Sequence, residues 1–319
     1  MRTLIGSLLF GCVLATQSVN AADGIPPPWA YSVNPPGGQP VPDDGSLRRV
    51  PDSAAAFTLT QIRDLFAAPD WHPEQHPAMP AAVSHGRKPD VFACGYCHLP
   101  NGLGRPENSS LAGLPADYIV QQVADFKSGA RKSSEPNSLP INLMIQVAKA
   151  ATEEEVKTAA AYFANLPRLP WIKVIETDTV PVTRVAGWML VAAEGGAREL
   201  IGDRIIEMPV DLERTELRDA ASGFIAYVPN GSIAKGAALI GGADGKTTAC
   251  GICHGADLRG LGPVPGLAGR SPSYIVRQLY DMRHRVRNGS WSALMKPVVA
   301  NLSEADMVAI AAYTASLAP

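Results

Sequence analysis

The 319-residue sequence has little cysteine, no strong net charge and no long apolar run. It contains five cysteines, its formal net charge is −2, and 46% of its residues are hydrophobic. Nucleic-acid-binding proteins usually carry a strongly basic patch, so this balance argues against that class. The apolar stretch at 4–15 is shorter than the roughly 20 residues that span a bilayer. We therefore expect a soluble mature chain, long enough for two modest domains.

The first 21 residues have the pattern of an export signal. Arg2 precedes the apolar stretch, and small residues lead up to Ala21. Cleavage near Ala21 predicts a periplasmic location. The alternative is lipidation of Cys12, which would hold the protein at a membrane, but Phe10 is a poor match to the small residue needed there. Once the signal is removed, four cysteines remain, and a disulfide scaffold is not expected.

Two parts of the chain repeat one pattern. Residues 93–102 read ACGYCHLPNG, and residues 249–256 read ACGICHGA. A shift of 156 residues superposes three pairs: Cys94 and Cys250, His98 and His254, Tyr118 and Tyr274. A shift of 151 then superposes three more: Met144 and Met295, Thr152 and Ser303, Tyr162 and Tyr313. A repeat of this length predicts two copies of one folding unit.

Each copy is predicted to be helical. From Tyr118 and from Tyr274 onward, apolar residues recur at helical spacing, which predicts one helix in each copy. Thr152 and Ser303 each have an acidic residue three positions later, which is the pattern of a capping box at a helix start. A closing helix is therefore expected in each copy, with a methionine in the loop just before it.

Composition divides the chain into five segments. The predicted boundaries are 1–21 for the signal peptide, 22–56 for a proline-rich strap, 57–168 for module 1, 169–228 for a bridge and 229–319 for module 2. The strap is dense in proline and glycine, which favours an extended or disordered segment. The bridge is rich in Val, Ile, Thr and Trp, and glycines split its short runs, which predicts a few strands and turns.

The repeated motif is the attachment pattern of c-type haem: two cysteines with two residues between them, followed directly by histidine. On one helical turn both thiols can reach the vinyl groups at one porphyrin edge and form thioethers, while the histidine ring faces the iron. Two covalently bound haem c groups are predicted, one on Cys94, Cys97 and His98 and one on Cys250, Cys253 and His254. A zinc half-site or a redox dithiol would need a second cysteine pair nearby or a strand-helix-strand setting, and neither is present.

The second axial ligand of each iron is predicted to be a methionine. Met144 and Met295 occupy equivalent repeat positions, and a methionine sulfur is a haem ligand in other cytochromes. Met282 and Met307 fall on the apolar faces of predicted helices, so we expect them in the core. The remaining histidines have no counterpart in the other copy and are interpreted as surface or structural residues; they are His72, His76, His85 and His284.

With these motifs each module resembles a class I cytochrome c, and the pair resembles the tandem dihaem cytochromes c of bacterial periplasms over residues 57–168 and 229–319. The resemblance implies a mainly α fold, with two cytochrome modules joined by a short β-containing bridge behind the proline-rich strap. Such modules often have a proline near the carbonyl that binds the proximal histidine. Pro265 matches that pattern, whereas Ser109 departs from it, so the two reduction potentials need not be equal.

Two six-coordinate irons leave no open position for a substrate, so one-electron transfer is the predicted function and no catalytic residue is expected. The predicted partners are a periplasmic dehydrogenase as donor and an oxidase or another cytochrome as acceptor, with membrane association only if Cys12 is lipidated. The alternatives are a dihaem peroxidase, which needs one open haem and two unlike modules, and the cytochrome subunit of a dehydrogenase complex.

Charge is distributed unevenly along the chain. From 229 to 319 nine basic residues face five acidic ones, whereas from 169 to 228 six face ten. Arg283, Arg285 and Arg287 crowd the end of the helix that begins at Tyr274. They are interpreted as a solvated face, or as partners of haem propionates and of the acidic bridge.

Overall fold

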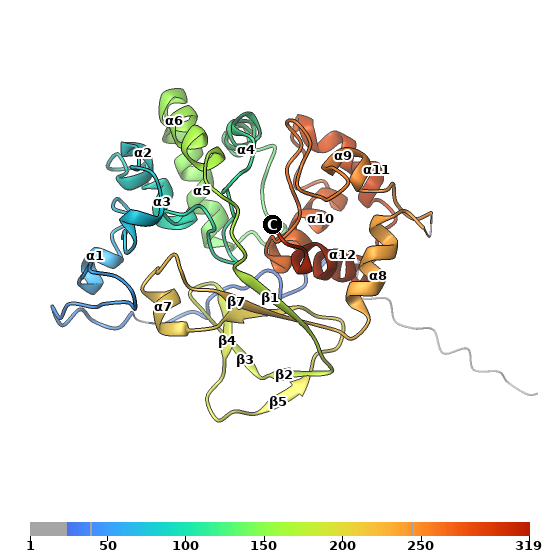
Figure 1. Ribbon diagram of the computed structural model, residues 1–319, viewed down its shortest axis with the longest axis horizontal. Helices are drawn as coiled ribbons and strands as arrows, with labels where there is room; N and C mark the ends of the chain where they lie inside the picture. Colours follow the sequence, from blue (N-terminus) through green and yellow to red (C-terminus); the bar gives the residue numbers. More distant parts are fainter. Residues whose placement is uncertain (1–23, 39, 244) are drawn as a thin grey trace, which may run out of the picture.

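The computed structural model describes residues 24–38, 40–243 and 245–319. The predicted signal peptide and Cys12 lie outside this part of the chain. Two helical modules lie side by side over a small region of strands (Figure 1). Within the described residues, no helix combines the length and the hydropathy needed to cross a bilayer. The mainly helical architecture with a β-containing bridge agrees with the predicted fold class.

Module 1 is built from short helices around an apolar core. Its helices are α1 (Leu59–Ile62), the 3-10 helix η1 (Pro73–Gln75), α2 (Ala81–Ser84), α3 (Cys94–His98), α4 (Ala116–Ser128), α5 (Leu139–Ala150) and α6 (Glu153–Ala164). The predicted capping box is present at α6, where the Thr152 side chain accepts from the Glu155 backbone N–H and Glu155 accepts in return. Phe163 of α6 and Ile119 of α4 are buried in the same core.

Module 2 repeats this arrangement with fewer residues before its last helix. Its helices are α8 (Ser232–Ile240), α9 (Gly251–His254), α10 (Pro272–Arg283), the 3-10 helix η2 (Ser290–Leu294), α11 (Met295–Val299) and α12 (Glu304–Ser316). Ser303 and Asp306 form the predicted capping box of α12. Gly236 lets α8 cross α12 closely, since a Cβ there would lie 2.0 Å from the Ala309 carbonyl oxygen.

The positions of the methionines correct one expectation and confirm another. Met144 lies inside α5 and Met295 is the first residue of α11, so neither is in a loop. In module 1 the apolar run around Met144 continues as helix up to Ala151, whose extended backbone leads directly into the cap of α6. Met282 and Met307 are buried in the core of module 2, as their helical spacing predicted.

The bridge contains the predicted strands. They are β1 (Ile172–Glu176), β2 (Thr179–Pro181), β3 (Thr183–Ala186), β4 (Met189–Ala192), β5 (Arg198–Leu200), β6 (Ile206–Pro209) and β7 (Phe224–Val228). One sheet has the order β1-β7-β6, with β1 parallel and β6 antiparallel to β7, while β2 pairs with β5 and β3 with β4. The short helix α7 (Leu212–Glu216), which the sequence analysis did not predict, follows β6. Along β7, Phe224 belongs to the core of module 1, whereas Ala226 and Val228 belong to that of module 2.

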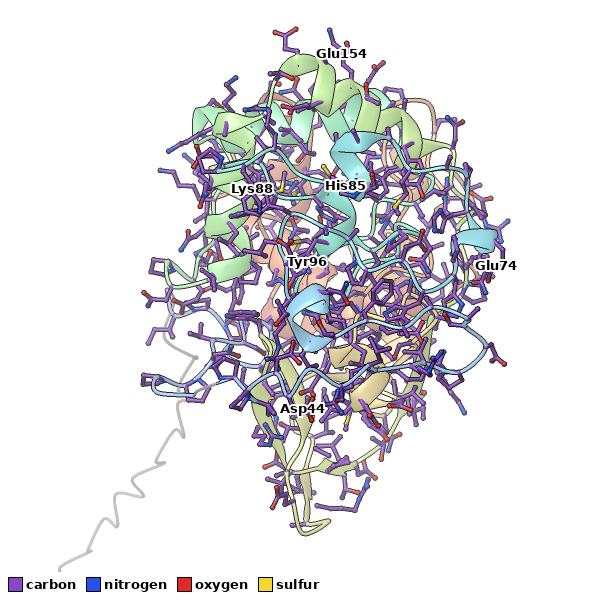
Figure 2. The ribbon with its side chains drawn as sticks, turned by 90° about the vertical axis from the view of Figure 1, so that its left-hand side faces the viewer. Asp44, Glu74, His85, Lys88, Tyr96 and Glu154 are labelled. Atoms are coloured by element: carbon purple, nitrogen blue, oxygen red, sulfur yellow. The ribbon has the colours of Figure 1, made fainter. Side chains whose placement is uncertain are left out.

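The described part of the strap is extended and packed rather than disordered. Ala30 and Tyr31 are buried in the core of module 2. The Tyr31 hydroxyl donates to Asp281 at 2.7 Å, and Arg277 donates to the Ala30 carbonyl at 2.8 Å. Further along, the Asp43 carboxylate of the strap accepts from the Thr60 backbone N–H of module 1 at 2.7 Å, and in Figure 2 Asp44 is seen below Tyr96. The N-terminal segment thus contacts both modules.

Candidate functional site

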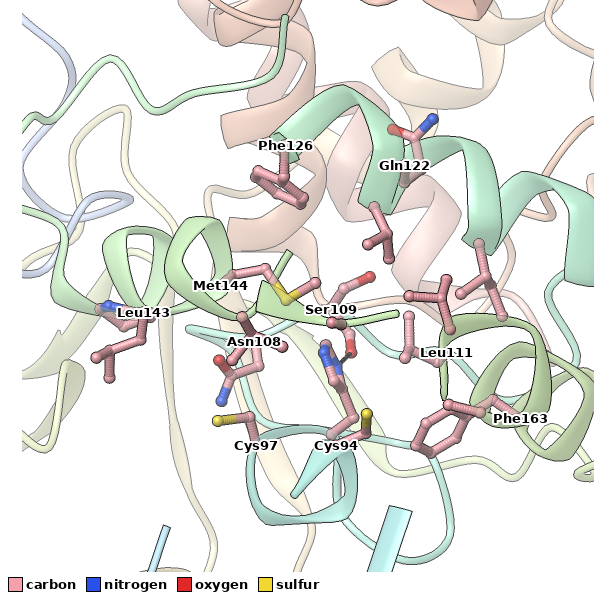
Figure 3. Close-up of a pocket in the computed structure, with 18 of the residues that line it drawn as sticks. Cys94, Cys97, Asn108, Ser109, Leu111, Gln122, Phe126, Leu143, Met144 and Phe163 are labelled. Carbon is pink, nitrogen blue, oxygen red and sulfur yellow. Dashed lines mark hydrogen bonds between the residues drawn. The ribbon is translucent and has the colours of Figure 1, made fainter. Parts of the chain in front are cut away.

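An apolar pocket in module 1 brings together four residues that the sequence analysis had singled out. Cys94, Cys97, His98 and Met144 all line it. Met144 reaches from α5 into the space between Phe126 on α4 and the cysteines of α3 (Figure 3). Two thiols, an imidazole and a thioether inside a largely apolar cavity are the donor set that a covalently attached haem requires. The residues of this pocket therefore fit haem c, which supplies one-electron redox chemistry when bound.

Both motif histidines are held in one tautomer by a backbone carbonyl. The His98 Nδ1–H donates to the Ser109 carbonyl at 2.8 Å, and the His254 Nδ1–H donates to the Pro265 carbonyl at 2.8 Å. This leaves the Nε2 lone pair of each ring available to a metal. Burial lowers the pKa of His98 and of His254, which favours the neutral, ligating form. Both modules make the same bond from the motif histidine to a backbone carbonyl. The presence of serine at position 109, where module 2 has Pro265, therefore does not by itself make the two iron sites different.

Three of the four motif cysteines lie in environments unlike those of a reactive surface dithiol. Burial raises the pKa of the Cys94 thiol to about 12 and also raises the pKa of Cys97 and of Cys250. Redox-active dithiols normally have a lowered thiol pKa, because the thiolate is the nucleophile. The environment thus favours attachment sites over redox-active dithiols.

In module 2 the equivalent residues lie around the core of that module, and Cys253 is the one that is more exposed than its counterpart in module 1. His254 is buried, and Cys250 and Met295 pack against the core of module 2. Cys253 is exposed. A hydrogen bond of 2.9 Å from the Thr247 hydroxyl to the Val298 carbonyl ties the segment before the attachment motif to α11. Cys250 and Met295 therefore pack against one core, and the segment before the attachment motif is bonded to the helix that begins at Met295.

The sequence analysis missed a polar cluster between the modules, which we name the inter-module cluster. It consists of three pairs related by the 156-residue shift: Tyr118 and Tyr274, Gln122 and Gln278, Arg131 and Arg287. Arg131 donates to Tyr274 at 3.1 Å and to Gln278 at 2.8 Å. Arg287 donates to Tyr118 at 2.8 Å and to Gln122 at 2.8 Å, so each arginine binds the tyrosine of the opposite module. The repeat alignment contained this signal, since all three pairs match in type.

The inter-module cluster is buried and positively charged. Arg131 and Arg287 are each 6% exposed, which overturns the interpretation of Arg287 as part of a solvated face. Burial raises the pKa of Tyr274, but Arg131 and Arg287 outweigh that effect and hold it at about 7. Arg131, Tyr274 and Gln278 also line the pocket of module 1. Residues of module 2 therefore form part of the wall of the module 1 site.

Comparison with known proteins identifies the family. No family model matches the chain. Over 235 residues the chain is 26% identical to a thiosulfate dehydrogenase electron acceptor of Stutzerimonas stutzeri, covering 73% of this chain and 82% of that protein. Over 144 residues it is 30% identical to cytochrome c4 of Azotobacter vinelandii, covering 41% of this chain and 67% of that protein. The crystal structure of reduced cytochrome c4 from Pseudomonas stutzeri aligns with 70% of this chain and 93% of its own, at 21% identity and a TM-score of 0.45. The chain belongs to the dihaem class I cytochromes c, which transfer electrons between redox partners through two covalently bound haem c groups.

Proposed function

We propose that each module holds one haem through the residues predicted from the repeat. The thioether-forming residues are Cys94 and Cys97 in module 1 and Cys250 and Cys253 in module 2. The axial ligands are His98 and Met144 in module 1 and His254 and Met295 in module 2. The observation that carries this proposal is the convergence of all four module 1 residues on one apolar pocket.

We further propose that the protein is an electron carrier rather than an enzyme. Histidine and methionine together fill both axial positions of an iron, so no coordination site is left for a substrate. The inter-module cluster supports electron exchange between the two haems, because side chains of module 2 line the pocket of module 1. Tyr274, Arg277 and Gln278 of module 2 belong to the wall of the proposed module 1 haem site.

A dehydrogenase is the proposed donor, and the periplasm is the proposed location. The relative from Stutzerimonas stutzeri is named as the electron acceptor of thiosulfate dehydrogenase, and the chain covers most of its length. Thiosulfate dehydrogenase is therefore the first donor to test. The export-signal pattern of the first 21 residues supports the location.

The test of the ligand assignment replaces each methionine by leucine, which removes the sulfur at nearly constant volume. Met144→Leu and Met295→Leu should each remove about half of the weak near-infrared band that arises from methionine-to-iron ligation. Each should also lower one reduction potential, since axial ligation shifts haem potentials within a span of about 0.8 V. The matched control is Met282→Leu in the core of module 2, which should keep the full band. A full band in Met144→Leu or in Met295→Leu would contradict the assignment of that ligand.

Carbon monoxide separates a carrier from a peroxidase. If methionine occupies both distal positions, the fully reduced protein should bind carbon monoxide slowly or not at all, and peroxide turnover should stay at background. Rapid carbon monoxide binding at one haem of the fully loaded protein, together with saturable peroxide reduction, would establish an enzyme instead.

A further inference from the structure

Module 2 holds the segment of module 1 that fixes the motif histidine. The Ser109 carbonyl accepts from the His98 Nδ1–H at 2.8 Å, and the Ser109 hydroxyl donates to the hydroxyl of Tyr274 at 3.2 Å. Arg270 donates to the carbonyl of the next residue, Ser110, at 2.6 Å. Tyr274 and Arg270 both belong to module 2. A short chain of contacts therefore runs from module 2 through one serine to the predicted iron ligand of module 1.

The bridge fixes Tyr274 in this position. The Ser271 hydroxyl caps helix α10 by accepting from the Tyr274 backbone N–H at 3.2 Å, and it donates to Glu207 on β6 at 2.7 Å. Glu207 is 3% exposed and also accepts from the Ser273 backbone N–H at 3.1 Å. The start of α10 is thus bonded to a buried carboxylate of the bridge, which limits the movement of the tyrosine.

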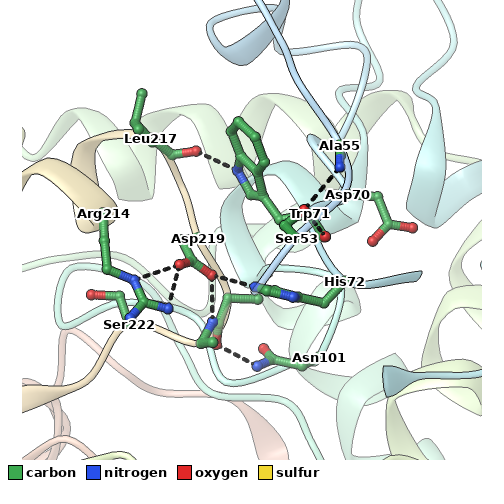
Figure 4. Close-up of polar contacts among 12 residues, drawn as sticks. Ser53, Ala55, Asp70, Trp71, His72, Asn101, Arg214, Leu217, Asp219 and Ser222 are labelled. Atoms are coloured by element: carbon green, nitrogen blue, oxygen red, sulfur yellow. Dashed lines mark hydrogen bonds and ion pairs between the residues drawn. The ribbon is translucent and has the colours of Figure 1, made fainter. Parts of the chain in front are cut away.

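The bridge also holds the other end of the loop that follows the attachment motif of module 1 (Figure 4). Asn101 donates to the Ala220 carbonyl at 2.6 Å. The residue before Ala220 is itself fixed, since the fully buried carboxylate of Asp219 binds His72 at 2.9 Å and Arg214 at 2.6 Å. The loop is therefore held at one end by the bridge and at the other end by module 2.

The equivalent loop of module 2 has a different residue at the decisive position. Pro265 stands where module 1 has Ser109, so its carbonyl accepts from His254 at 2.8 Å but it has no hydroxyl to donate to a tyrosine. Gly262 of this loop is exposed, whereas its counterpart Pro106 is buried. The bond to the histidine is thus the same in both modules, but the residue that accepts it is held differently.

The contact to Ser109 has a definite effect on the iron site. A carbonyl held firmly against the histidine N–H makes the imidazole a stronger donor, which favours ferric over ferrous iron. Arg131 donates to the Tyr274 hydroxyl at 3.1 Å, so loss of that hydroxyl would also leave a positive charge with one partner fewer beside the pocket. Both effects keep the reduction potential of module 1 lower while the tyrosine hydroxyl is present.

We propose that Tyr274 of module 2 is a positioning residue for the iron ligand of module 1: through Ser109 it fixes His98 and lowers the reduction potential of that module. Because Pro265 has no hydroxyl, module 2 cannot make the equivalent contact, and two similar haem motifs have different potentials. This inference rests on the haem assignment proposed above, and it adds which residue sets one potential relative to the other.

Redox titration of the intact dihaem protein, followed by its visible spectrum, tests the inference. Met144→Leu identifies the potential of module 1 as the one that it lowers. Tyr274→Phe and Ser109→Ala should each raise that potential by the equivalent of about a tenfold change in the equilibrium constant, which is about 59 mV for a one-electron couple. The double variant should shift it no further than Tyr274→Phe alone, since both changes break one contact. Ser109→Thr retains the hydroxyl and should retain the potential.

The matched control is Tyr31→Phe, which removes another buried tyrosine hydroxyl that bonds the same helix. Tyr31 donates to Asp281 of α10 at 2.7 Å and packs in the core of module 2. This substitution loosens α10 without changing the contact to Ser109, so both potentials should stay unchanged. An equal shift in the control would mean that general loosening of the helix sets the potential, and it would refute the role of Tyr274.

Proton exchange provides a readout that does not depend on the potential. By NMR, the His98 Nδ1–H should exchange with solvent several-fold faster in Tyr274→Phe than in Tyr31→Phe, because its acceptor is no longer held. The Nδ1–H of His254 should keep its rate in both variants. An unchanged module 1 potential in Tyr274→Phe and Ser109→Ala would overturn the inference while the haem assignment stands. If Met144→Leu moved neither potential, the ligand assignment itself would fail, and the inference would fail with it.

Discussion

The inter-module cluster predicts how strongly one arginine holds the two modules together. Arg287 is 6% exposed and donates to Tyr118 at 2.8 Å, to Gln122 at 2.8 Å and to Gln278 at 3.1 Å. A hydrogen bond from a charged donor contributes about 1.5–3 kcal/mol, so three independent bonds would give more than about 4.5 kcal/mol. They are not independent, because Arg131 also donates to both glutamines and would continue to do so without Arg287.

Arg287→Met should therefore cost about 2–4 kcal/mol of unfolding free energy. The main loss is the bond to Tyr118, and the removal of one of two neighbouring positive charges offsets a part of it. Urea unfolding followed by circular dichroism measures the cost. The matched control is Arg285→Met, two residues away and exposed, which should change the free energy by less than about 0.5 kcal/mol.

A double-mutant cycle isolates the bond between the modules. Arg287→Met combined with Tyr118→Phe should show a coupling free energy of about 1–2 kcal/mol, because the two side chains lose one shared interaction. If Arg287→Met were no more destabilising than Arg285→Met, or if the coupling were zero, the cluster would not be what joins the modules at this interface.

Three further predictions concern the modules themselves. Asp306→Asn should cost about 2–3 kcal/mol of unfolding free energy, because Lys235 and Lys246 outweigh the effect of burial and lower the pKa of Asp306. Glu155→Gln, at the equivalent but more exposed position of module 1, should cost about 0.5 kcal/mol. A carboxylate whose pKa is lowered by folding stabilises the folded protein at pH values above its unfolded pKa of 3.8, and this contribution is lost as the pH falls from there through the lower folded pKa. The difference in urea midpoint between Asp306→Asn and the parent protein should therefore shrink below about pH 4. A constant difference would refute this account. Replacing Cys250 and Cys253 by alanine should reduce the covalent haem content from two to one by mass spectrometry; two remaining haems would disprove that attachment site. Trp71→Ala should cost about 3–5 kcal/mol in urea unfolding, since the indole is 2% exposed and donates to the Leu217 carbonyl of the bridge. A loss below about 1 kcal/mol would mean that the indole does not anchor the bridge there.

Local patterns in the sequence predicted local structure well. The capping boxes at Thr152 and Ser303 are present because a side chain and a backbone three residues apart need no distant partner. The repeat of the haem motif likewise predicted two similar modules, since the attachment chemistry depends on a single helical turn. Helical spacing also placed Met282 and Met307 in the core.

Features that depend on distant segments were not predictable from those patterns. Helix α7 is only five residues long, and Arg218, which follows it, donates to the carbonyl of Tyr96, a residue more than 100 positions away. Arg287 looks like one of three solvent-facing arginines until the opposite module is placed beside it. The sequence predicts a loop around Met144, because the capping box at Thr152 marks the start of the next helix only a few residues later. Helix α5 forms there and packs against α4, and this packing is not visible in the local sequence. In each case a tertiary contact decided the outcome.

The segments outside the repeat make two similar modules unequal. Strand β7 runs beneath both, and its buried face places Phe224 in one core and Ala226 and Val228 in the other. Side chains two residues apart share one face of a strand, so this single strand fixes the spacing of the two cores. The bridge that contains β7 also covers the attachment loop of module 1, where Arg218 donates to the Tyr96 carbonyl, whereas Ile252 at the equivalent position of module 2 is 68% exposed.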